Sequence, residues 1–415
     1  MTPVDSSQSP SLEAAIAYLR SPQGIRDRCS TLLKLALDGS LTHFQCDLER
    51  LDVVADYVIQ VMREQYPSGD VPFHSRWRHF EIGDPQRLRL LDDAGLSPLE
   101  QARARVDLAV TSVLLDAGAG PTWRYVEPES GRVLQRSEGL AIASFHWFCQ
   151  GGLSSDPAHP LQADAVGLQA VTPEALTDAF QVSETNPLVG LSGRVGLLQQ
   201  LGQVLAAHPD YFGQPARPGH LVDYLQGQAE AGAIAATAVL QVVLDGLSDI
   251  WPGRITLNHT NLGDVWPHPA LPQTHPGSDL VPFHKLSQWL TYSLLEPLQA
   301  LGLTILDINH LTGLPEYRNG GLLLDLGLLQ PKHPAVTQHR HAPGSEVIVE
   351  WRALTVALLD QVAEAMRRRL GLTAAQLPLA KVLEGGTWSA GRRIAASLRP
   401  GGLPPIQIES DGTVF

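Results

Sequence analysis

The sequence predicts a mainly α-helical protein, one large helical domain with short β hairpins and a short C-terminal β piece. In several long segments apolar residues recur at three- and four-residue steps, the period of an amphipathic helix. The clearest of these segments are residues 47–66, 106–120, 286–302 and 351–371. Gly371 follows the last apolar position of the fourth segment, as expected where a helix ends. Pro297 predicts a bend in the third.

Strand signals are few and short. Residues 122–126 and 132–136 flank the turn sequence EPESG, a pattern that predicts one β hairpin. Residues 345–349, SEVIV, and the tail 404–415 are predicted to add a few paired residues. The helical segments are far longer, so the predicted fold class is mainly α.

Three segments rich in proline, glycine or histidine interrupt the helices, at about 150–172, 252–282 and 331–345. Long loops in compact proteins are often functional, and we therefore expect these loops to fold over a site. Residues 1–15 are interpreted as a flexible N-terminal leader, and residues 16–415 as a single compact helical domain.

Composition argues against several classes of protein. With 415 residues, 44% hydrophobic and 18% charged, the chain has the make-up of a globular, enzyme-sized protein. A net charge of −13 without a basic patch argues against nucleic acid as a partner. The N-terminus lacks the pattern of a secretory signal, and no apolar run reaches the roughly 18 residues that suggest a membrane span. We therefore expect a soluble cytoplasmic protein that binds neither nucleic acid nor membranes.

The stretch LTGLPEYRNGGLLLDLG concentrates polar groups at the head of an apolar helix. Glu316, Tyr317, Arg318 and Asn319 stand directly before two glycines and a leucine-rich run. Such a group either caps a buried helix or faces a ligand, and the glycines would let a backbone approach closely.

Glu350 and Asp264 are two further candidate carboxylates. Glu350 lies toward the buried side of the helix predicted over 351–370, where a carboxylate must be functional or paired, here with Arg352. Asp264 lies in the second long loop, where it either forms a turn or binds a sugar hydroxyl.

Basic side chains suited to an anionic ligand occur in two places. In HSRWRHF an extended chain would present Arg76 and Arg78 on one face. That arrangement suits a phosphate, or else it is an exposed strand edge. At a later helix start, His284, Lys285 and Trp289 are candidate substrate contacts, although an ordinary helix start explains the same spacing.

Metal and cofactor motifs are absent from the sequence. His339 and His341 can reach one ion if the chain is extended, with His333 near them. No HExxH motif and no cysteine cluster accompanies them. The fingerprints of nucleotide cofactors, GxGxxG followed by an acid and GxxxxGK[ST], do not occur either. We therefore predict no bound metal and no cofactor.

Several strings resemble the uracil catabolism protein 4 family: SRWRHF, LLDAGAG, RSEGLA, VPFHKLSQWLTYSL, LTGLPEYRNGG, VEWRALTVALLD, LEGGTW and SDGTVF. They cover nearly the whole chain from about residue 71 onward. The resemblance implies a place in a pyrimidine-degradation route in which uracil is first made into its nucleotide. The ring is then opened, leaving a ribosyl-urea species that must lose urea.

A local similarity links the chain to queuosine salvage proteins, N-glycosidases with a helical, DNA-glycosylase-like fold. Those proteins carry an acid–Tyr–Arg triplet before a helix that closes with Leu-Gly, as Glu316 and the two residues after it do here. They also carry a later Glu-x-Arg, which Glu350 and Arg352 match. Glu316 stands where they use Asp, one methylene shorter. The similarity implies a DNA-glycosylase-like fold and cleavage of an N-ribosidic bond.

These features predict a metal-independent N-ribosyl hydrolase that releases urea from ribosylurea or its 5′-phosphate. Cleaving an N-ribosidic bond builds positive charge on the sugar, which a fixed carboxylate stabilises unless it activates water instead. We expect Glu316 to be the principal catalytic carboxylate, kept ionised by a helix dipole that lowers its pKa. Glu350 would support it.

Substrate-binding residues are expected among the polar and aromatic groups already named: Tyr317, Arg318, Asn319, Arg352, Asp264, His284, Lys285, Trp289, Arg76 and Arg78. The four basic groups Arg76, Arg78, Lys285 and Arg318 should include those that hold an anion. Two alternatives are a metal-dependent hydrolase of a ureido or amide group that uses the loop histidines, and a binding or scaffold protein without activity.

Overall fold

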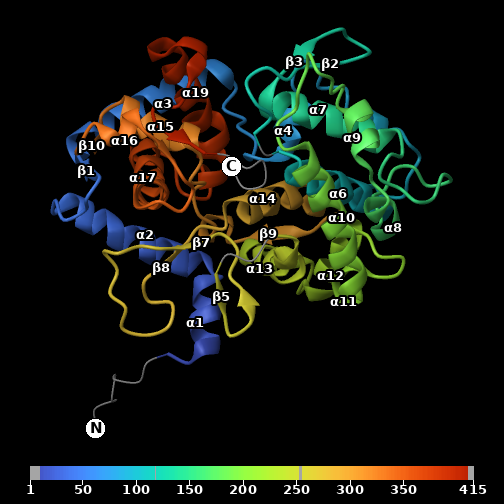
Figure 1. Cartoon of the computed structure of the whole chain (residues 1–415), viewed down its shortest axis with the longest axis horizontal. Helices are drawn as coiled ribbons and strands as arrows, with labels where there is room; N and C mark the ends of the chain where they lie inside the picture. The colour runs from blue at the N-terminus through green and yellow to red at the C-terminus, as the bar shows by residue number, and fades with distance from the viewer. Residues whose placement is uncertain (1–9, 117, 252–254, 410–415) are drawn as a thin grey trace. The chain divides into compact units, whose positions relative to one another are not determined.

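The computed structural model describes residues 10–116, 118–251 and 255–409, and these residues are mainly helical with short strands, which confirms the predicted fold class (Figure 1). Contacts divide them into two compact units. The first unit contains residues 10–72, 255–285 and 309–409, and the second contains 73–251 and 286–308. The likeness to DNA glycosylases and the single folding domain over 16–415 stay predictions.

The first unit is built on long helices joined by shorter ones. Its α-helices are α1 (Leu12–Leu19), α2 (Pro22–Leu37), α3 (Leu51–Gln65), α15 (Tyr317–Asp325), α16 (Ala335–Gln338), α17 (Glu346–Leu370), α18 (Leu379–Val382) and α19 (Trp388–Leu398). Single turns of other helix types are η1 (Leu48–Arg50), η5 (Leu383–Thr387), which is a π-helix, and η6 (Pro400–Gly402), while η4 (Ile308–His310) begins in the second unit.

The described residues of the first unit contain four strand pairs, of which β1–β10 and β11–β12 join distant segments. The antiparallel pairs are β1 (Phe44–Cys46) with β10 (Leu329–Pro331), β5 (Thr256–Leu257) with β6 (Thr260–Asn261), and β7 (Val265–Pro267) with β8 (Leu280–Pro282). The parallel pair is β11 (Arg340–His341) with β12 (Gln407–Ile408). The predicted C-terminal β piece is therefore present at β12, and its last residues, 410–415, lie outside the described residues.

Helix α17 forms the centre of the first unit and packs against α2, α3 and α15. It begins at Glu346 and ends at Gly371, whose φ of 66° is left-handed, as predicted for a C-terminal glycine. The predicted strand at 345–349 was wrong, because these residues form the first turn of α17. A helix start that is buried on every side shows a continuous apolar run, and periodicity cannot distinguish such a run from a buried strand.

Two glycines allow α15 to lie close to its neighbours. A Cβ on Gly320, in α15, would meet the Trp351 ring nitrogen of α17 at 2.6 Å. A Cβ on Gly391, in α19, would meet the carbonyl oxygen of Arg318 at 2.0 Å. Figure 1 shows α15, α17 and α19 grouped in this part of the chain. The start of α15, where the predicted principal catalytic residue Glu316 lies, is thus fixed by close packing of the backbone.

The second unit is also helical. Its helices are α4 (Arg76–Phe80), α5 (Arg89–Asp92), α6 (Pro98–Leu114), α7 (Arg136–Cys149), α8 (Ala165–Gln169), α9 (Pro173–Ala179), α10 (Leu191–Ala207), α11 (Pro209–Phe212), η2 (Pro218–His220), α12 (Leu221–Gln228), α13 (Ala236–Leu247), η3 (Ser248–Ile250) and α14 (Lys285–Ala300). The predicted hairpin is confirmed as β2 (Tyr125–Val126) with β3 (Val133–Leu134), and β4 (Ala233–Ala235) pairs in parallel with β9 (Thr304–Leu306).

The extended conformation expected for HSRWRHF was also wrong, because Arg76–Phe80 is the helix α4. Helix α4 is anchored to α14 by two hydrogen bonds. The backbone N–H of Arg76 donates to Ser293 Oγ at 2.9 Å, and the indole N–H of Trp77 donates to the Ser293 carbonyl at 2.7 Å. Arg76 and Trp77 are therefore both buried, not presented on opposite faces. The segment is too short for hydrophobic periodicity to reveal its secondary structure, which depends on tertiary contacts instead.

Two predictions about the ends and surface of the chain touch the described residues only in part. The expected leader, 1–15, reaches α1, which begins at Leu12, and residues 1–9 lie outside the described residues. Among the described helices, none combines the length and the apolar character needed to cross a membrane.

Gly391→Ala should lower the free energy of unfolding by about 1–3 kcal/mol, the usual cost of overpacking, because the new methyl group would collide with the Arg318 carbonyl. Urea unfolding measures the change. The matched control is Gly196→Ala in α10, where a Cβ meets nothing within 4 Å. Helix propensity should make that control up to about 1 kcal/mol more stable. Equal effects at both positions would contradict this account of the α15–α19 contact.

Candidate functional site

Glu316 is the N-cap of α15. Its backbone is extended, with φ −100° and ψ 147°, and its side chain turns back onto the helix. Oε2 accepts from the N–H groups of Arg318 at 2.8 Å and Asn319 at 3.3 Å. The carboxylate therefore caps the helix, one of the two roles that the sequence left open. Both of these bonds end on Oε2, and the residue as a whole is half-buried.

The pKa of Glu316 is raised above the ordinary value of a glutamate. Loss of solvation raises this pKa, while the charges of Lys285 and Arg318 and the two N–H donors lower it by less. The prediction that the helix dipole would lower the pKa of this carboxyl was therefore wrong, because the cost of burying the charge exceeds the stabilisation by the helix start. Lys285, Glu316 and Arg318 lie close enough for their charges to interact.

The other polar residues of this segment are largely engaged with the protein. The Asn319 amide donates to the Leu314 carbonyl at 3.1 Å and accepts from the Thr387 hydroxyl at 2.9 Å. Arg318 donates to the Gly402 carbonyl at 2.7 Å. Tyr317 is 39% exposed, and its ring lies 4.8 Å from the Arg318 guanidinium. The group thus braces the start of α15 and leaves the phenol at the surface.

Asp264, in the loop between β6 and β7, is the most heavily bonded carboxylate of the first unit that was predicted as a site residue. Arg352 of α17 donates to both of its oxygens, at 2.8 and 2.7 Å. The Trp266 indole N–H and the backbone N–H of Lys285 donate to it at 2.8 and 3.0 Å. Burial alone would raise the pKa of Asp264, but these donors hold it well below the usual range.

Arg352 therefore pairs with Asp264, while the suggested pairing of Arg352 with Glu350 stays a prediction. Residues two apart on a helix do not face each other. The Arg352 guanidinium also lies 4.1 Å from the centre of the Phe283 ring, a cation–π contact. His284 is buried, and its Nε2 lies 2.8 Å from the Leu19 carbonyl. Burial lowers the pKa of this imidazole, which favours its neutral form.

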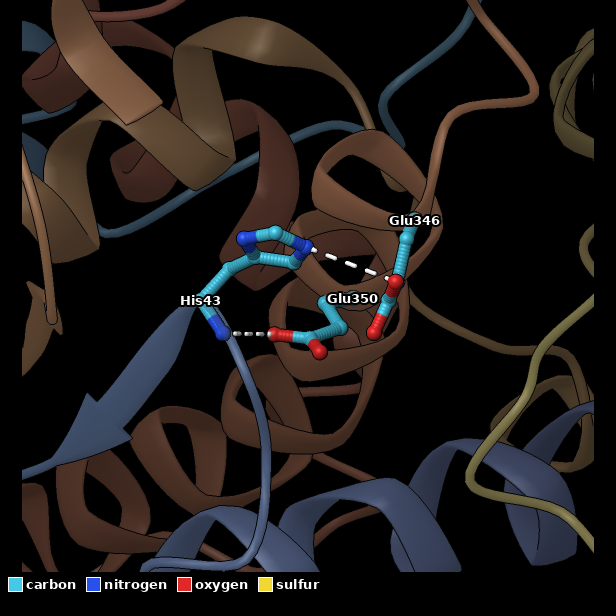
Figure 2. Close-up of side chains that lie close together, drawn as sticks. All are labelled: His43, Glu346 and Glu350. Atoms are coloured by element: carbon cyan, nitrogen blue, oxygen red, sulfur yellow. Dashed lines mark hydrogen bonds and ion pairs between the residues drawn. The ribbon is translucent and has the colours of Figure 1, made fainter. Parts of the chain in front are cut away.

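Glu350 is fully buried and faces the chain that leads into β1 (Figure 2). Its two oxygens accept from the backbone N–H groups of Thr42 at 3.2 Å and His43 at 3.1 Å. His268 Nε2 lies 3.6 Å from Oε1. One helical turn earlier, Glu346 accepts from the Thr42 hydroxyl at 2.9 Å and lies 3.7 Å from His43 Nε2. His43 and His268 belong to no sequence motif, so only the fold reveals them.

Three predicted site residues belong to the second unit, where they have partners of their own. Arg76 pairs with Asp116 at 2.7 Å, and Arg78 pairs with Glu296 at 2.7 Å. Trp289 packs its ring against histidines of the segment around α4. A phosphate would have to compete with these carboxylates for either guanidinium, whereas the charges of Lys285 and Arg318 lie near Glu316.

Two of the long loops supply residues to the first unit. The loop over 255–282 carries Asp264 and His268. The loop over 331–345 carries His333 and packs against the Trp266 ring, which a Cβ on Gly344 would meet at 2.3 Å. Residues 252–254, at the start of the loop predicted over 252–282, lie outside the described residues.

Two groups of described residues have the spacing of a cation site. One is His43, Glu346 and Glu350, and the other is Glu127, Glu129 and His146 in the second unit. In the second group the Arg87 guanidinium donates to Glu127 at 2.8 Å, so a cation would have to displace an existing positive charge.

Asp264→Asn should lower the free energy of unfolding at pH 7 by about 3–5 kcal/mol, because it leaves the buried Arg352 charge unpaired. Since the folded-state pKa of Asp264 lies below the ordinary value of 3.8, the stabilisation is present above that value and is lost as pH falls through the folded pKa. The gap between wild type and variant should therefore narrow in acid. Asp52→Asn, whose exposed carboxylate pairs with Arg369, should barely change stability. Similar losses in both variants would refute the assignment.

Comparison with known proteins places the chain in a family. The family described as "Protein of unknown function (DUF1688)" matches residues 18–415. The chain is 38% identical over 437 residues to uracil catabolism protein 4 of Lachancea kluyveri, covering 96% of this chain and 99% of the relative. It is 40% identical over 413 residues to protein urg3 of Schizosaccharomyces pombe, with coverage of 96% and 99%. Matched almost from end to end, this chain belongs to the DUF1688 family, which is that of uracil catabolism protein 4.

Proposed function

We propose that this protein acts in uracil catabolism as an N-ribosyl hydrolase that releases urea from ribosylurea or its 5′-phosphate. The pathway is suggested by the name of the Lachancea relative. The reaction rests chiefly on one observation: a partly buried carboxylate, Glu316, is held through one oxygen while its pKa is raised. Such a group is preorganised, and it accepts a proton more readily than an ordinary glutamate.

The reaction requires one water molecule for each bond broken. The bond between C1′ of the ribose and the urea nitrogen breaks as positive charge develops on the sugar. Water adds its oxygen to C1′ and gives up a proton, for which we propose Glu316 as the acceptor. Over the whole turnover the proton taken from water ends on the departing urea nitrogen, so Glu316 returns to its ionised form and the products are urea and ribose or ribose 5-phosphate. The charge of Glu316 also stabilises the developing cation.

The neighbours of Glu316 have two different tasks in this proposal. Lys285 supplies a positive charge suited to a phosphate or to sugar hydroxyls, and Asp264 fixes its backbone N–H at 3.0 Å. The exposed ring of Tyr317 offers a surface for the sugar or the urea. The backbone N–H groups of Arg318 and Asn319 fix Glu316 by hydrogen bonds to its Oε2. These bonds do not depend on whether the two side chains touch the substrate.

A second candidate function is a metal-dependent hydrolase acting on a ureido or amide group. The observation that favours it is the group of His43, Glu346 and Glu350, whose ligand atoms have the spacing of a cation site. The two reactions give different products, since amide hydrolysis would release ammonia and carbon dioxide in place of intact urea. Mass spectrometry of purified protein incubated with ribosylurea, and with its 5′-phosphate, distinguishes them. Chelator-insensitive release of urea is expected.

Glu316→Gln should reduce kcat by at least about 10²-fold, a typical scale for one electrostatic contribution at a reacting centre. Wild-type kcat/KM should fall as pH falls through the pKa of Glu316, because the protonated carboxyl no longer accepts a proton. Burial raises this pKa, so the fall should begin at a higher pH than for an ordinary glutamate. This acidic limb should disappear in the variant, whose amide still caps α15.

The matched control is Asp47→Asn, because Asp47 caps η1 through one oxygen, which accepts from the Glu49 N–H at 3.1 Å. The control should retain both turnover and melting temperature, since asparagine is an equally good cap. If Glu316→Gln turned over normally, or lost activity only in proportion to early melting, the carboxylate would be a cap alone.

Lys285→Gln should raise KM for the 5′-phosphate about tenfold, equivalent to about 1.4 kcal/mol, with little change in kcat. A phosphate contact binds ground state and transition state alike. KM for unphosphorylated ribosylurea should change far less. The control is Lys34→Gln, which removes an exposed lysine of α2. Identical kinetics for both substrates in wild type and variant would eliminate the anion-binding role.

A further inference from the structure

A second cluster of titratable side chains lies where α17 meets the chain before β1, and the proposed hydrolysis does not use it. His43, Glu346 and Glu350 each direct a ligand atom into one space, and these atoms lie within 4.8 Å of one another (Figure 2). Glu346 and Glu350 are one turn apart on α17. Two carboxylates at this spacing repel each other, so their approach to one imidazole requires an explanation.

The distance between His43 and Glu346 matches two ligands of one ion better than it matches a hydrogen bond. His43 Nε2 lies 3.7 Å from a Glu346 oxygen, which is too long for a hydrogen bond. Two ligands bound to one Zn²⁺ at about 2.0–2.2 Å in tetrahedral geometry lie about 3.4 Å apart. If the distance between His43 Nε2 and the Glu346 oxygen shortened slightly, both atoms could therefore bind one ion.

The second nitrogen of His43 is placed as a metal-binding histidine requires. Its Nδ1 lies 2.9 Å from His333 Nε2, so one of the two nitrogens carries the shared hydrogen. With His43 as the donor, its Nε2 lone pair points toward Glu346. Ligating histidines usually donate their other N–H to such a partner, which fixes the tautomer and the ring orientation. His333 is then a positioning residue.

His268 provides an independent observation. It is 1% exposed, and its Nε2 has no hydrogen-bond partner among the described residues, although it lies 3.6 Å from Glu350 Oε1. Its Nδ1 accepts from the Ala270 N–H at 3.2 Å, so in the neutral ring Nε2 carries the hydrogen and points at the carboxylate. A buried donor left just beyond bonding distance is costly. Carboxylates that bind a metal are usually hydrogen-bonded in turn, and the His268 N–H is the group that lies closest to doing this for Glu350 Oε1.

We infer that His43, Glu346 and Glu350 bind one divalent cation, and that Zn²⁺ fits this set best. An imidazole beside two carboxylates suits Zn²⁺, which takes both His nitrogen and Asp or Glu oxygen as ligands. Mg²⁺ and Ca²⁺ favour oxygen ligands throughout. The ion offsets the charge of the two glutamates and ties the first turn of α17 to the segment before β1. The inference concerns binding and does not depend on the proposed hydrolysis.

Equilibrium dialysis of the metal-free full chain against Zn²⁺ tests the inference, with bound zinc measured by elemental analysis and Co²⁺ absorption as a second readout. Wild type should bind one Zn²⁺ per chain, and zinc should raise its melting temperature. Glu346→Gln is the cleanest variant, because Glu346 is partly exposed and its amide still accepts from the Thr42 hydroxyl. It should weaken binding at least about 100-fold, as expected when a direct ligand is lost.

Two further variants separate this site from other binding. His333→Ala should weaken zinc binding about 10–100-fold, the usual effect of losing a partner of a ligating histidine. A purely structural His333 would leave the affinity unchanged. Glu129→Gln is the matched control, since Glu129 is a carboxylate in the cluster of the second unit that includes Arg87-bonded Glu127. It should bind zinc as wild type does.

Circular dichroism of each metal-free variant confirms that the fold is retained. The inference is overturned if wild type binds no zinc, or if Glu346→Gln binds it as tightly as wild type. It is also overturned if Glu129→Gln is the variant that loses binding. None of these outcomes bears on urea release, which is measured separately.

Discussion

The ion pair of Asp264 with Arg352 is the contact on which the candidate site depends. It joins a loop that has little regular structure to the central helix α17, through two hydrogen bonds of 2.8 and 2.7 Å. Removing both charges from water is costly, and only several well-aligned donors offset that cost. The same carboxylate also accepts from the N–H of Lys285 at 3.0 Å. The Asp264 carboxylate therefore fixes the loop and also the backbone position of Lys285, whose charge acts on Glu316.

Glu316 shows how a structural role and the catalytic role proposed for it can share one side chain. Capping uses a single oxygen, and it places the carboxylate at the positive end of a helix, which favours the ionised form. Burial acts in the opposite direction and prevails, so the pKa of Glu316 rises. The capping alternative and the catalytic one are thus compatible.

Helix α17 presents different chemistry on different sides. Glu346 and Glu350 turn toward Thr42 and His43, whereas Arg352 turns toward Asp264. Consecutive residues on a helix are rotated by about 100°, so close neighbours in sequence serve different partners. The resemblance to Glu-x-Arg motifs is therefore a similarity of position that does not imply contact between the two side chains. Each must be interpreted with the segment that it faces.

The amino-acid sequence by itself determined the helical class, the hairpin around 127–131, the end of α17 at Gly371 and the position of Glu316 at a helix start. These features depend on periodicity, turn chemistry and capping, which act over a few neighbouring residues. Only the tertiary structure decided that Arg352 pairs with Asp264, that HSRWRHF is a buried helix, and that His43 and His268 approach Glu350. Such partners are separated by tens or hundreds of residues, and local pattern carries no information about which of them meet. The pKa of Glu316 belongs with these, because burial is a property of the assembled core.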